Sequence, residues 1–443
     1  MTAIRLQILA SLIVLMVGYA AVWRRRENVL AYVDGGFLIT MLLMPLLATR
    51  IIDRVPTEIA QLYANLLLMG AAGYAIGLAC GTIPGNLHRW RRPPIFAYPL
   101  SRNRYVETIF RRARILGLAG AASLLVGFVA IGYVPLLAAD RVSAKYGVGP
   151  YASGFQRGVI PYRTGLALAS AALPLVLIAY YNRRRFADLL IAGSLAAGLL
   201  ASLSRTLAFS GIVLVIVCVL VERKVGPTKI VLLVALLFAL GQISTEIVFP
   251  ETANRAVPLW GRIAESPPDM RDHLGFLARY EVLGEQTYGA TVLGGLSPRD
   301  NYWEPNLYAL RTLTGSTNVG AIPSGGLRLP APIWGYVSFG FIGAGLWSLL
   351  AGFFAGWGAR RLRNLLTDIR RQPGCSVNLT CAAVYYAGTF GVLSMFYFAS
   401  SAMIVQIAVA LYIASSPLLH GRRNFEQELL AGRRGGRAGS YTR

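Results

Sequence analysis

The side chains of this sequence with the clearest chemical potential are arginines near the ends of apolar stretches. A guanidinium group is planar and permanently charged, and it binds phosphate through two parallel hydrogen bonds. Several such groups together suit a diphosphate, whereas one alone is as readily a solvated or carboxylate-paired surface charge. Five members of this set fall in segments expected to face water, namely Arg157, Arg163, Arg279, Arg299 and Arg328.

Arg205 differs from these because it lies between two apolar stretches, in the sequence SLSRTLAF, with few polar neighbours. An arginine at membrane depth is costly unless it is paired or hydrated, so it marks a functional site by default. The alternative is an arginine whose stem lies along apolar surface while its head reaches the interface. Its expected position at the outer membrane face favours an anionic ligand near the lipid headgroups.

Acidic residues and one histidine are candidates for acid–base chemistry. His273 is the only histidine of the outward segments and could act as a general base near neutral pH, although a lone histidine more often has a structural role. The alternatives are Glu281 and Glu304, with Glu285 and Asp300. The outward segments contain no D-x-D pair and no H-E-x-x-H motif, so we expect neither a bound metal ion nor a cofactor.

Aromatic residues alternate with glycine and proline between residues 288 and 336. Flat rings beside polar groups offer a surface on which the C–H faces of a sugar can stack. The same pattern is equally compatible with the belt of Tyr and Trp at membrane–water interfaces. The candidates for substrate binding are Tyr288, Trp303 and Tyr336, and the same stretch contains Tyr302, Tyr308 and Trp334.

The elements that position these residues are transmembrane helices. The chain of 443 residues is 55% hydrophobic and 14% charged, whereas soluble domains have about 25% charged residues. Apolar stretches of about 20 residues are long enough to span a bilayer. We expect an all-α polytopic membrane protein with about eleven spans, at approximately 4–22, 35–52, 58–82, 115–138, 164–181, 187–204, 206–221, 229–249, 331–358, 378–396 and 399–416.

Basic residues orient these spans. Arg24–Arg26 follow the first apolar stretch and only Arg5 precedes it, the reverse of the charge order of a signal peptide, so this stretch is expected to remain as a span. Lysine and arginine collect at cytoplasmic span ends, and every short loop agrees with an outside N-terminus and a cytoplasmic C-terminus. The net charge of +23 therefore reflects membrane topology, and we expect no binding of nucleic acid.

The spans divide the chain into an N-terminal membrane domain (1–249), a large outward loop (250–330), a last group of spans (331–416) and a basic cytoplasmic tail (417–443) expected to be disordered. The long loop cannot lie in lipid, because its backbone groups would lack partners there. A shorter outward loop at about 139–163 would carry Arg157 and Arg163. The inward loop at 83–114 mixes basic and aromatic residues, as do segments that lie against anionic headgroups.

Small residues and cysteines add two further expectations. Gly73, Gly77 and Gly81 recur at four-residue spacing in the third span, a pattern that permits close approach of another helix. None of the four cysteines falls in an outward segment, so neither a disulfide framework nor a zinc site is indicated.

The segment from 288 to 357 resembles a known family. It reads YGATVLGGLSPRDNYWEPN and, after a polar run, IPSGGLRLPAPIWGYVSFGFIGAGLWSLLAGFFAGW. This resembles the Wzy-type polymerases of O-antigen and exopolysaccharide repeat units, and Ser204-Arg205 at a span start is similar to these polymerases and to the related O-antigen ligases. The matching residues are Tyr288-Gly289, Pro298-Arg299, Trp303, Pro305, Gly325-Gly326, Pro330 or Pro332, and Phe339-Gly340 with Gly343.

Two positions depart from the family's pattern. The family often has an acid before the tyrosine of the late-span entry, where this chain has Trp334-Gly335-Tyr336, and Glu304 stands where a lysine is usual. Any role that those two family side chains play is therefore not carried over.

The resemblance implies transfer of a growing glycan from a polyprenyl diphosphate onto a lipid-linked repeat unit, at the outer face of the bacterial inner membrane, in a GT-C-like fold. Arg205, Arg279 and Arg299 would neutralise the leaving diphosphate without a metal ion, supported by Arg157, Arg163 and Arg328. His273, Glu281 or Glu304 would supply the base.

The implied partners are the polyprenyl-diphosphate-linked oligosaccharide as donor and acceptor, membrane lipid and a chain-length regulator. Two alternatives stay open. An O-antigen ligase would use the same donor with a different acceptor, and a flippase or transporter would move lipid-linked oligosaccharide across the membrane.

Overall fold

A computed structural model describes residues 2–22, 49–83, 102–147, 149–234, 236–237, 270–296, 302–315, 329–371, 376–397, 399, 403–405, 407–409 and 412. All structural statements below concern these residues. Within them every regular element is a helix and no strand occurs.

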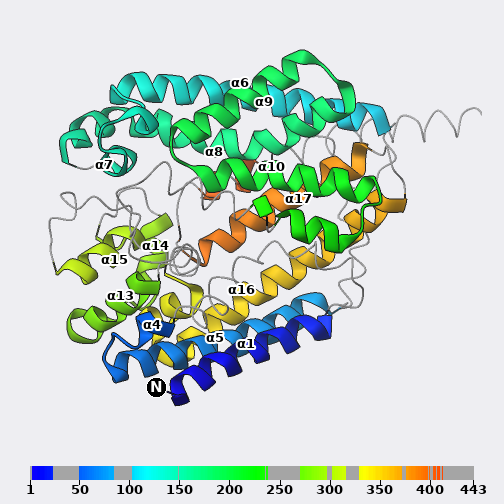
Figure 1. The fold of residues 1–443 in the computed structure, drawn as a ribbon. Helices are drawn as coiled ribbons and strands as arrows, with labels where there is room; N and C mark the ends of the chain where they lie inside the picture. Colours follow the sequence, from blue (N-terminus) through cyan, green and yellow to red (C-terminus); the bar gives the residue numbers. More distant parts are fainter. Residues whose placement is uncertain are drawn as a thin grey trace, which may run out of the picture.

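The longer helices form two groups (Figure 1). The first contains α1 (Thr2–Val22), α5 (Thr57–Thr82) and the first half of α16 (Ala331–Arg371). The second contains α6 (Arg102–Ile131), α8 (Ala152–Arg183), α9 (Phe186–Ala201), α10 (Arg205–Glu222), α17 (Ser376–Met395) and the end of α16. Because its two halves belong to different hydrophobic cores, α16 joins the groups.

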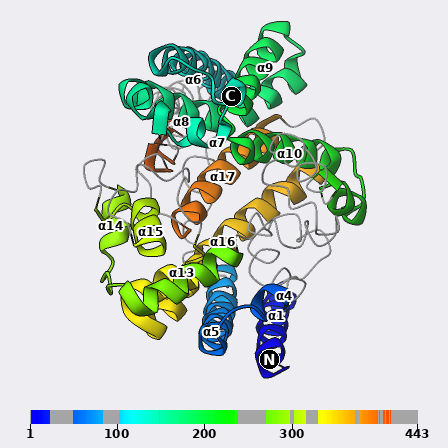
Figure 2. The same cartoon turned by 60° about the vertical axis from the view of Figure 1, so that its left-hand side comes forward.

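Shorter helices gather at one end of these groups. They are α4 (Thr49–Ile52), α7 (Arg141–Tyr146), α13 (Met270–Leu283), α14 (Ala290–Leu296) and α15 (Pro305–Thr314), with 3-10 turns η5 (Pro135–Leu137) and η6 (Gly149–Tyr151). Figure 2 shows α13, α14 and α15 together at one side of the molecule.

Five stretches of the described chain are long and apolar enough to cross a membrane. They are Thr2–Val22, Thr57–Thr82, Val106–Ile131, Ser143–Arg183 and Ala331–Arg371, and Phe186–Ala201 and Ser210–Glu222 are shorter apolar helices. Many of their side chains are exposed and hydrophobic, as lipid-facing positions are. The protein is therefore a helical, membrane-associated protein.

Most expected spans coincide with helices, and some boundaries were wrong. Helices α1, α5, α9, α10 and α17 match the expected stretches to within a few residues. The chain is already helical at 102–114, expected as part of an inward loop, and at 152–163, expected as part of an outward loop. The spans expected at 35–52, 229–249 and 399–416 lie largely outside the described residues, so the count of eleven stays a prediction.

The glycine spacing in α5 is confirmed as a site of close helix approach. A Cβ added to Gly73, Gly77 or Gly81 would overlap a backbone carbonyl oxygen of α16. The contact is reciprocal, because a Cβ at Gly352 would lie 2.9 Å from the carbonyl carbon of Tyr74. The backbones of α5 and α16 thus touch along several turns, as in helix pairs packed through small residues.

Basic residues collect at one end of the helices, which we call the basic end. Arg183 at the end of α8 and Arg360 in α16 lie there, and so do Ile83, Glu107 and Glu222. There the end of α5 is joined to α16 by a hydrogen bond of 2.9 Å from Arg360 Nη1 to the carbonyl oxygen of Ile83. The basic end lies at the right of Figure 1, whereas α7, α13, α14 and α15 lie at the left.

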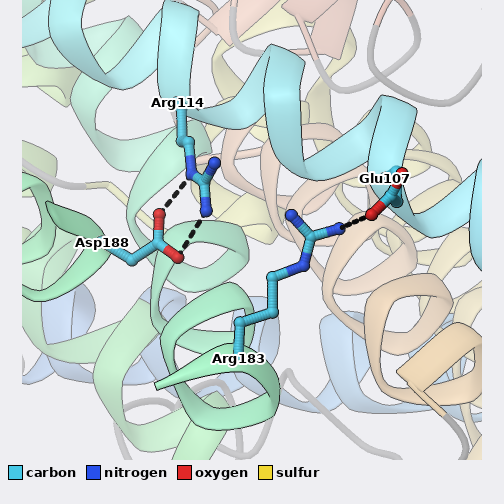
Figure 3. Close-up of polar contacts among 4 residues, drawn as sticks. All are labelled: Glu107, Arg114, Arg183 and Asp188. Carbon is cyan, nitrogen blue, oxygen red and sulfur yellow. Dashed lines mark hydrogen bonds and ion pairs between the residues drawn. The ribbon is translucent and has the colours of Figure 1, made fainter. Parts of the chain in front are cut away.

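Two ion pairs connect α6 to the end of α8 and to the first turn of α9 (Figure 3). Arg114 donates from Nε and Nη2 to the two carboxylate oxygens of Asp188, which is fully buried. Arg183 Nη2 lies 3.2 Å from Glu107 Oε1, and this carboxylate is 65% exposed. Of the two pairs, the bidentate one with Asp188 is therefore enclosed by protein.

Helix α16 breaks near its start, where the sequence predicts one continuous span. Phe339 and Gly340 leave helical geometry, and Gly340 has φ +63°. Beyond the break the chain reverses, so that a Cβ at Gly335 would lie 2.8 Å from Cα of Ala344. A continuous helix would separate positions nine residues apart by about 14 Å. Residues 331–338 therefore form a short helix that folds back on the rest of α16.

Candidate functional site

The candidate site lies where α13, the turn at 284–289 and the break in α16 meet. Thr287 donates its N–H to the carbonyl oxygen of Val337 at 2.9 Å, and Tyr288 donates to Ser338 at 3.1 Å. These bonds satisfy carbonyl groups that the end of the short helix leaves without helical partners. The rings of Tyr288 and Phe339 meet edge to face at 6.4 Å. Two motifs of the resemblance, Tyr288-Gly289 and Phe339-Gly340, are thus in contact.

The aromatic residues of this region divide into a buried and an exposed set. Trp303 stacks on Tyr308 at 5.9 Å, and Tyr308 lies 6.5 Å from Trp334, so these rings pack against one another. The exposed rings are those of Tyr288, Phe339 and Tyr302, residues whose exposed fractions are 71%, 53% and 51%. We call Tyr288 and Phe339 the aromatic shelf. Of the predicted sugar-binding rings, Tyr288 is open to a ligand and Trp303 is mainly a packing residue.

Tyr336, the third predicted sugar-binding ring, contacts a carboxylate. Its hydroxyl donates to Glu281 Oε1 at 3.0 Å. The ring lies edge to face with Tyr280 at 5.9 Å and 5.2 Å from Phe341, across the break in α16. Burial, followed by the nearby Glu281 and Tyr288, raises the pKa of Tyr280 to about 12. Tyr280 therefore stays protonated and neutral beside this carboxylate.

The other two candidates for a base have structural surroundings. His273 is 3% exposed and lies on the face of α13 that packs on α5, with its ring 6.3 Å from that of Tyr63. Glu304 caps α15: one oxygen accepts from the N–H of Leu307 at 2.9 Å and the other from the side chain of Asn306 at 2.8 Å. A capping carboxylate stabilises the helix by satisfying its first N–H groups.

The arginines of the predicted diphosphate site fall on several elements. Arg157 and Arg163 are exposed on α8, and the hydroxyl of the adjacent Tyr162 donates at 3.3 Å to the carbonyl oxygen of Ser202, in the turn that precedes Arg205. The backbone therefore brings the segments of Arg163 and Arg205 together. Arg205 is the first residue of α10, and its side chain lies outside the described part of the structure.

The arginines of the long loop are not joined to this pair by the described contacts. Arg279 is exposed on α13, which packs on α5 and α15, and both views place α13 away from α8 (Figures 1 and 2). Arg299 and Arg328 lie outside the described residues. Arg279 therefore belongs to the neighbourhood of Glu281 and the aromatic shelf rather than to that of Arg163.

Sequence reasoning missed the break in α16 and the ion pair of Asp188. Phe339-Gly340 sits within an apolar run that reads as one span, and only the flanking glycines signalled a turn. The signal for Asp188 was a carboxylate within the apolar sequence FADLLIAGSL, since such residues inside membrane segments are rare and are usually paired.

The helices and the site define a class. The protein is a helical membrane-associated protein, with exposed aromatic rings and a carboxylate where a broken apolar helix begins. Among the protein families, curated proteins and solved structures with which the chain was compared, none matches it.

Proposed function

We propose that this protein is a glycosyltransferase that joins polyprenyl-diphosphate-linked oligosaccharide repeat units into a surface polysaccharide, on the outer face of the bacterial inner membrane. The observation that carries the proposal is the contact between Tyr288-Gly289 and Phe339-Gly340. Both belong to the motif order that resembles the repeat-unit polymerases. They meet as an exposed aromatic surface beside a carboxylate, a composition suited to a sugar.

In the proposed reaction a hydroxyl of the acceptor repeat unit attacks the anomeric carbon of the donor glycan. The new C–O bond forms as the bond between that carbon and the diphosphate oxygen breaks, and the diphosphate leaves with the electron pair. We expect Arg205, Arg279 and Arg299 to neutralise the charge that develops on the leaving group, with Arg157, Arg163 and Arg328 in support. A carboxylate takes the hydroxyl proton.

This assignment needs the basic end in the cytoplasm and the aromatic shelf outside. Lysine and arginine are retained on the cytoplasmic side of membranes, so we expect a reporter fused after Arg423 to be active only in the cytoplasm. The same reporter inserted at Gly149, in the exposed turn before α8, should be active only outside. The measurement is alkaline phosphatase against fluorescent protein activity in cells. The opposite pair of signals would contradict the orientation.

Arg205→Ala is expected to reduce polymer by about 100-fold or more, the usual effect of removing a group that stabilises charge in the transition state. The measurement is the length of surface polysaccharide in cells that lack the wild-type gene and carry the variant. The matched control is Arg185→Ala, an exposed arginine at the basic end, which should leave the polymer unchanged. Normal polymer from a correctly inserted Arg205→Ala variant would remove Arg205 from the site.

The same cells separate the proposed function from its alternatives. Loss of a polymerase leaves single repeat units on the surface. Loss of a ligase leaves long polymer that is not attached to its final acceptor, and loss of a flippase leaves lipid-linked precursor inside the membrane. Either of the last two patterns in the deletion strain would contradict the proposed function.

A further inference from the structure

Glu281 and Tyr336 form a carboxylate–phenol pair at the water-facing side of the broken helix. The carboxylate is exposed at the last turn of α13, and its Oε1 accepts the hydroxyl proton of Tyr336 at 3.0 Å. Among the described residues, Tyr336 is the hydrogen-bond donor to this carboxylate, and Oε2 is the oxygen that an incoming group would reach.

The phenol is held from two sides, so it fixes the orientation of the carboxylate. Tyr280 contacts the Tyr336 ring edge to face, and Phe341 contacts it from beyond the break. The short helix that carries Tyr336 is in turn fixed by the hydrogen bonds of Thr287 and Tyr288 to its last carbonyl groups. A carboxylate on an exposed helix end would otherwise sample several rotamers.

The pair lies next to the aromatic shelf. Tyr336 directly precedes Val337 and Ser338, whose carbonyl oxygens accept from the N–H groups of Thr287 and Tyr288. A pyranose that stacks on the rings of Tyr288 and Phe339 would therefore lie beside the short helix that carries Tyr336. A catalytic base has to reach the proton that it removes.

Competing groups in the same region are already committed to other contacts. His273 is buried between α13 and α5, and both oxygens of Glu304 accept hydrogen bonds at the start of α15. Neither can approach a ligand on the shelf without loss of those contacts. Geometry thus favours Glu281 over His273 and Glu304.

We propose that Glu281 is the catalytic base that deprotonates the acceptor sugar, with Tyr336 as the residue that positions it. This inference rests on the proposed function. The acceptor O–H bond breaks as its oxygen forms the bond to the anomeric carbon of the donor, and the electron pair of the donor C–O bond leaves with the diphosphate. The proton passes to Glu281 Oε2 and then to water, so no further reactant is needed.

The test is chain extension by the purified full-length protein in proteoliposomes that contain a polyprenyl-diphosphate-linked single repeat unit. Glu281→Gln keeps the shape of the side chain and the hydrogen-bond acceptor but removes the base, so the rate should fall by about 100-fold or more. The matched control is Glu58→Gln, an exposed carboxylate in the first turn of the neighbouring α5, which should extend chains at the wild-type rate. The unfolding midpoint in detergent should be the same for both variants.

Tyr336→Phe separates positioning from a purely structural role. Without the phenol hydroxyl the carboxylate is no longer oriented, so kcat should fall by about 10-fold while KM for the repeat unit stays the same. A structural role alone predicts a lower unfolding midpoint in detergent, with kcat per folded protein unchanged.

The outcomes distinguish the two proposals. If wild type extends chains and Glu281→Gln does so equally well, the role of Glu281 is wrong while the function stands. If Glu281→Gln loses activity together with its folded state, as judged by the unfolding midpoint, the role in chemistry is also overturned. If folded wild type in these proteoliposomes forms no polymer from a repeat unit that another polymerase extends, the proposed function is wrong and this inference falls with it.

Discussion

Gly77→Leu is expected to prevent α5 and α16 from packing and to remove most of the folded protein from the membrane. A Cβ at this position would already overlap the carbonyl oxygen of Leu349 and would lie 2.8 Å from the N–H nitrogen of Phe353. Backbone atoms cannot move aside as a side chain can, so the two helices must separate. Overpacking in cores costs about 1–3 kcal/mol and sometimes more. We expect at least the upper end of that range.

The measurement is the unfolding midpoint of the purified protein in detergent, together with the yield of protein that elutes without aggregation. Two glycine variants serve as controls. Gly345→Ala lies on α16 beside the same interface, yet its Cβ would meet only the flexible end of Met69 at 3.7 Å; Gly193→Ala in α9 would meet nothing within 4 Å. Both should unfold as wild type does. A wild-type midpoint for Gly77→Leu would contradict the contact between α5 and α16.

The sequence could predict that α5 has a contact face but could not predict its partner. Glycines at four-residue spacing place three bare backbone segments on one side of a helix, and this is a local property. The partner, α16, lies more than 250 residues away and carries its own small residues at Gly345, Gly352 and Gly356. Other helices of this chain are also rich in glycine and alanine, so composition alone did not select among them.

The candidate site was predicted by residue type, while its geometry depended on two features hidden in the sequence. Gly340 lies in an apolar run where hydropathy gives no sign that φ is positive. The structural roles of His273 and Glu304 could have been predicted from the sequence. His273 lies on the apolar face that Met270, Leu274 and Leu277 define at helical spacing, and a glutamate before Pro305 is a pattern of helix starts.

The sequence analysis also placed the start of α8 too late, because its first residues are polar. The segment ASGFQRGVIPYR reads as a loop because it combines Gly, Pro and Arg, yet it is helical from Ala152. Gly158 allows the helix to approach α6, since a Cβ there would lie 2.6 Å from the side chain of Ile131. Tertiary packing thus outweighs the low helix propensity of these residues. The consequence for function is that Arg157 and Arg163 stand on a rigid element.

Asp188→Ala is expected to destabilise the protein by about 3–5 kcal/mol, because it leaves the guanidinium of Arg114 facing a buried position without its partner. Asp188 is fully buried, and Arg114 is 22% exposed and binds both carboxylate oxygens (Figure 3). The neighbouring pair supplies a matched comparison. Glu107 is 65% exposed, so Glu107→Ala should cost only about 0–1 kcal/mol, as exposed pairs do.

A double variant distinguishes loss of a buried partner from loss of packing. Arg114→Met with Asp188→Leu replaces the ion pair by apolar side chains of similar length, and such replacements are often neutral or stabilising. Unfolding in detergent should therefore show Asp188→Ala far below wild type and the double variant close to it or above. If the double variant is as unstable as Asp188→Ala, the ion pair itself holds α6 to α9. Recovery would instead mean that α6 and the first turn of α9 need only a well-packed contact at this position.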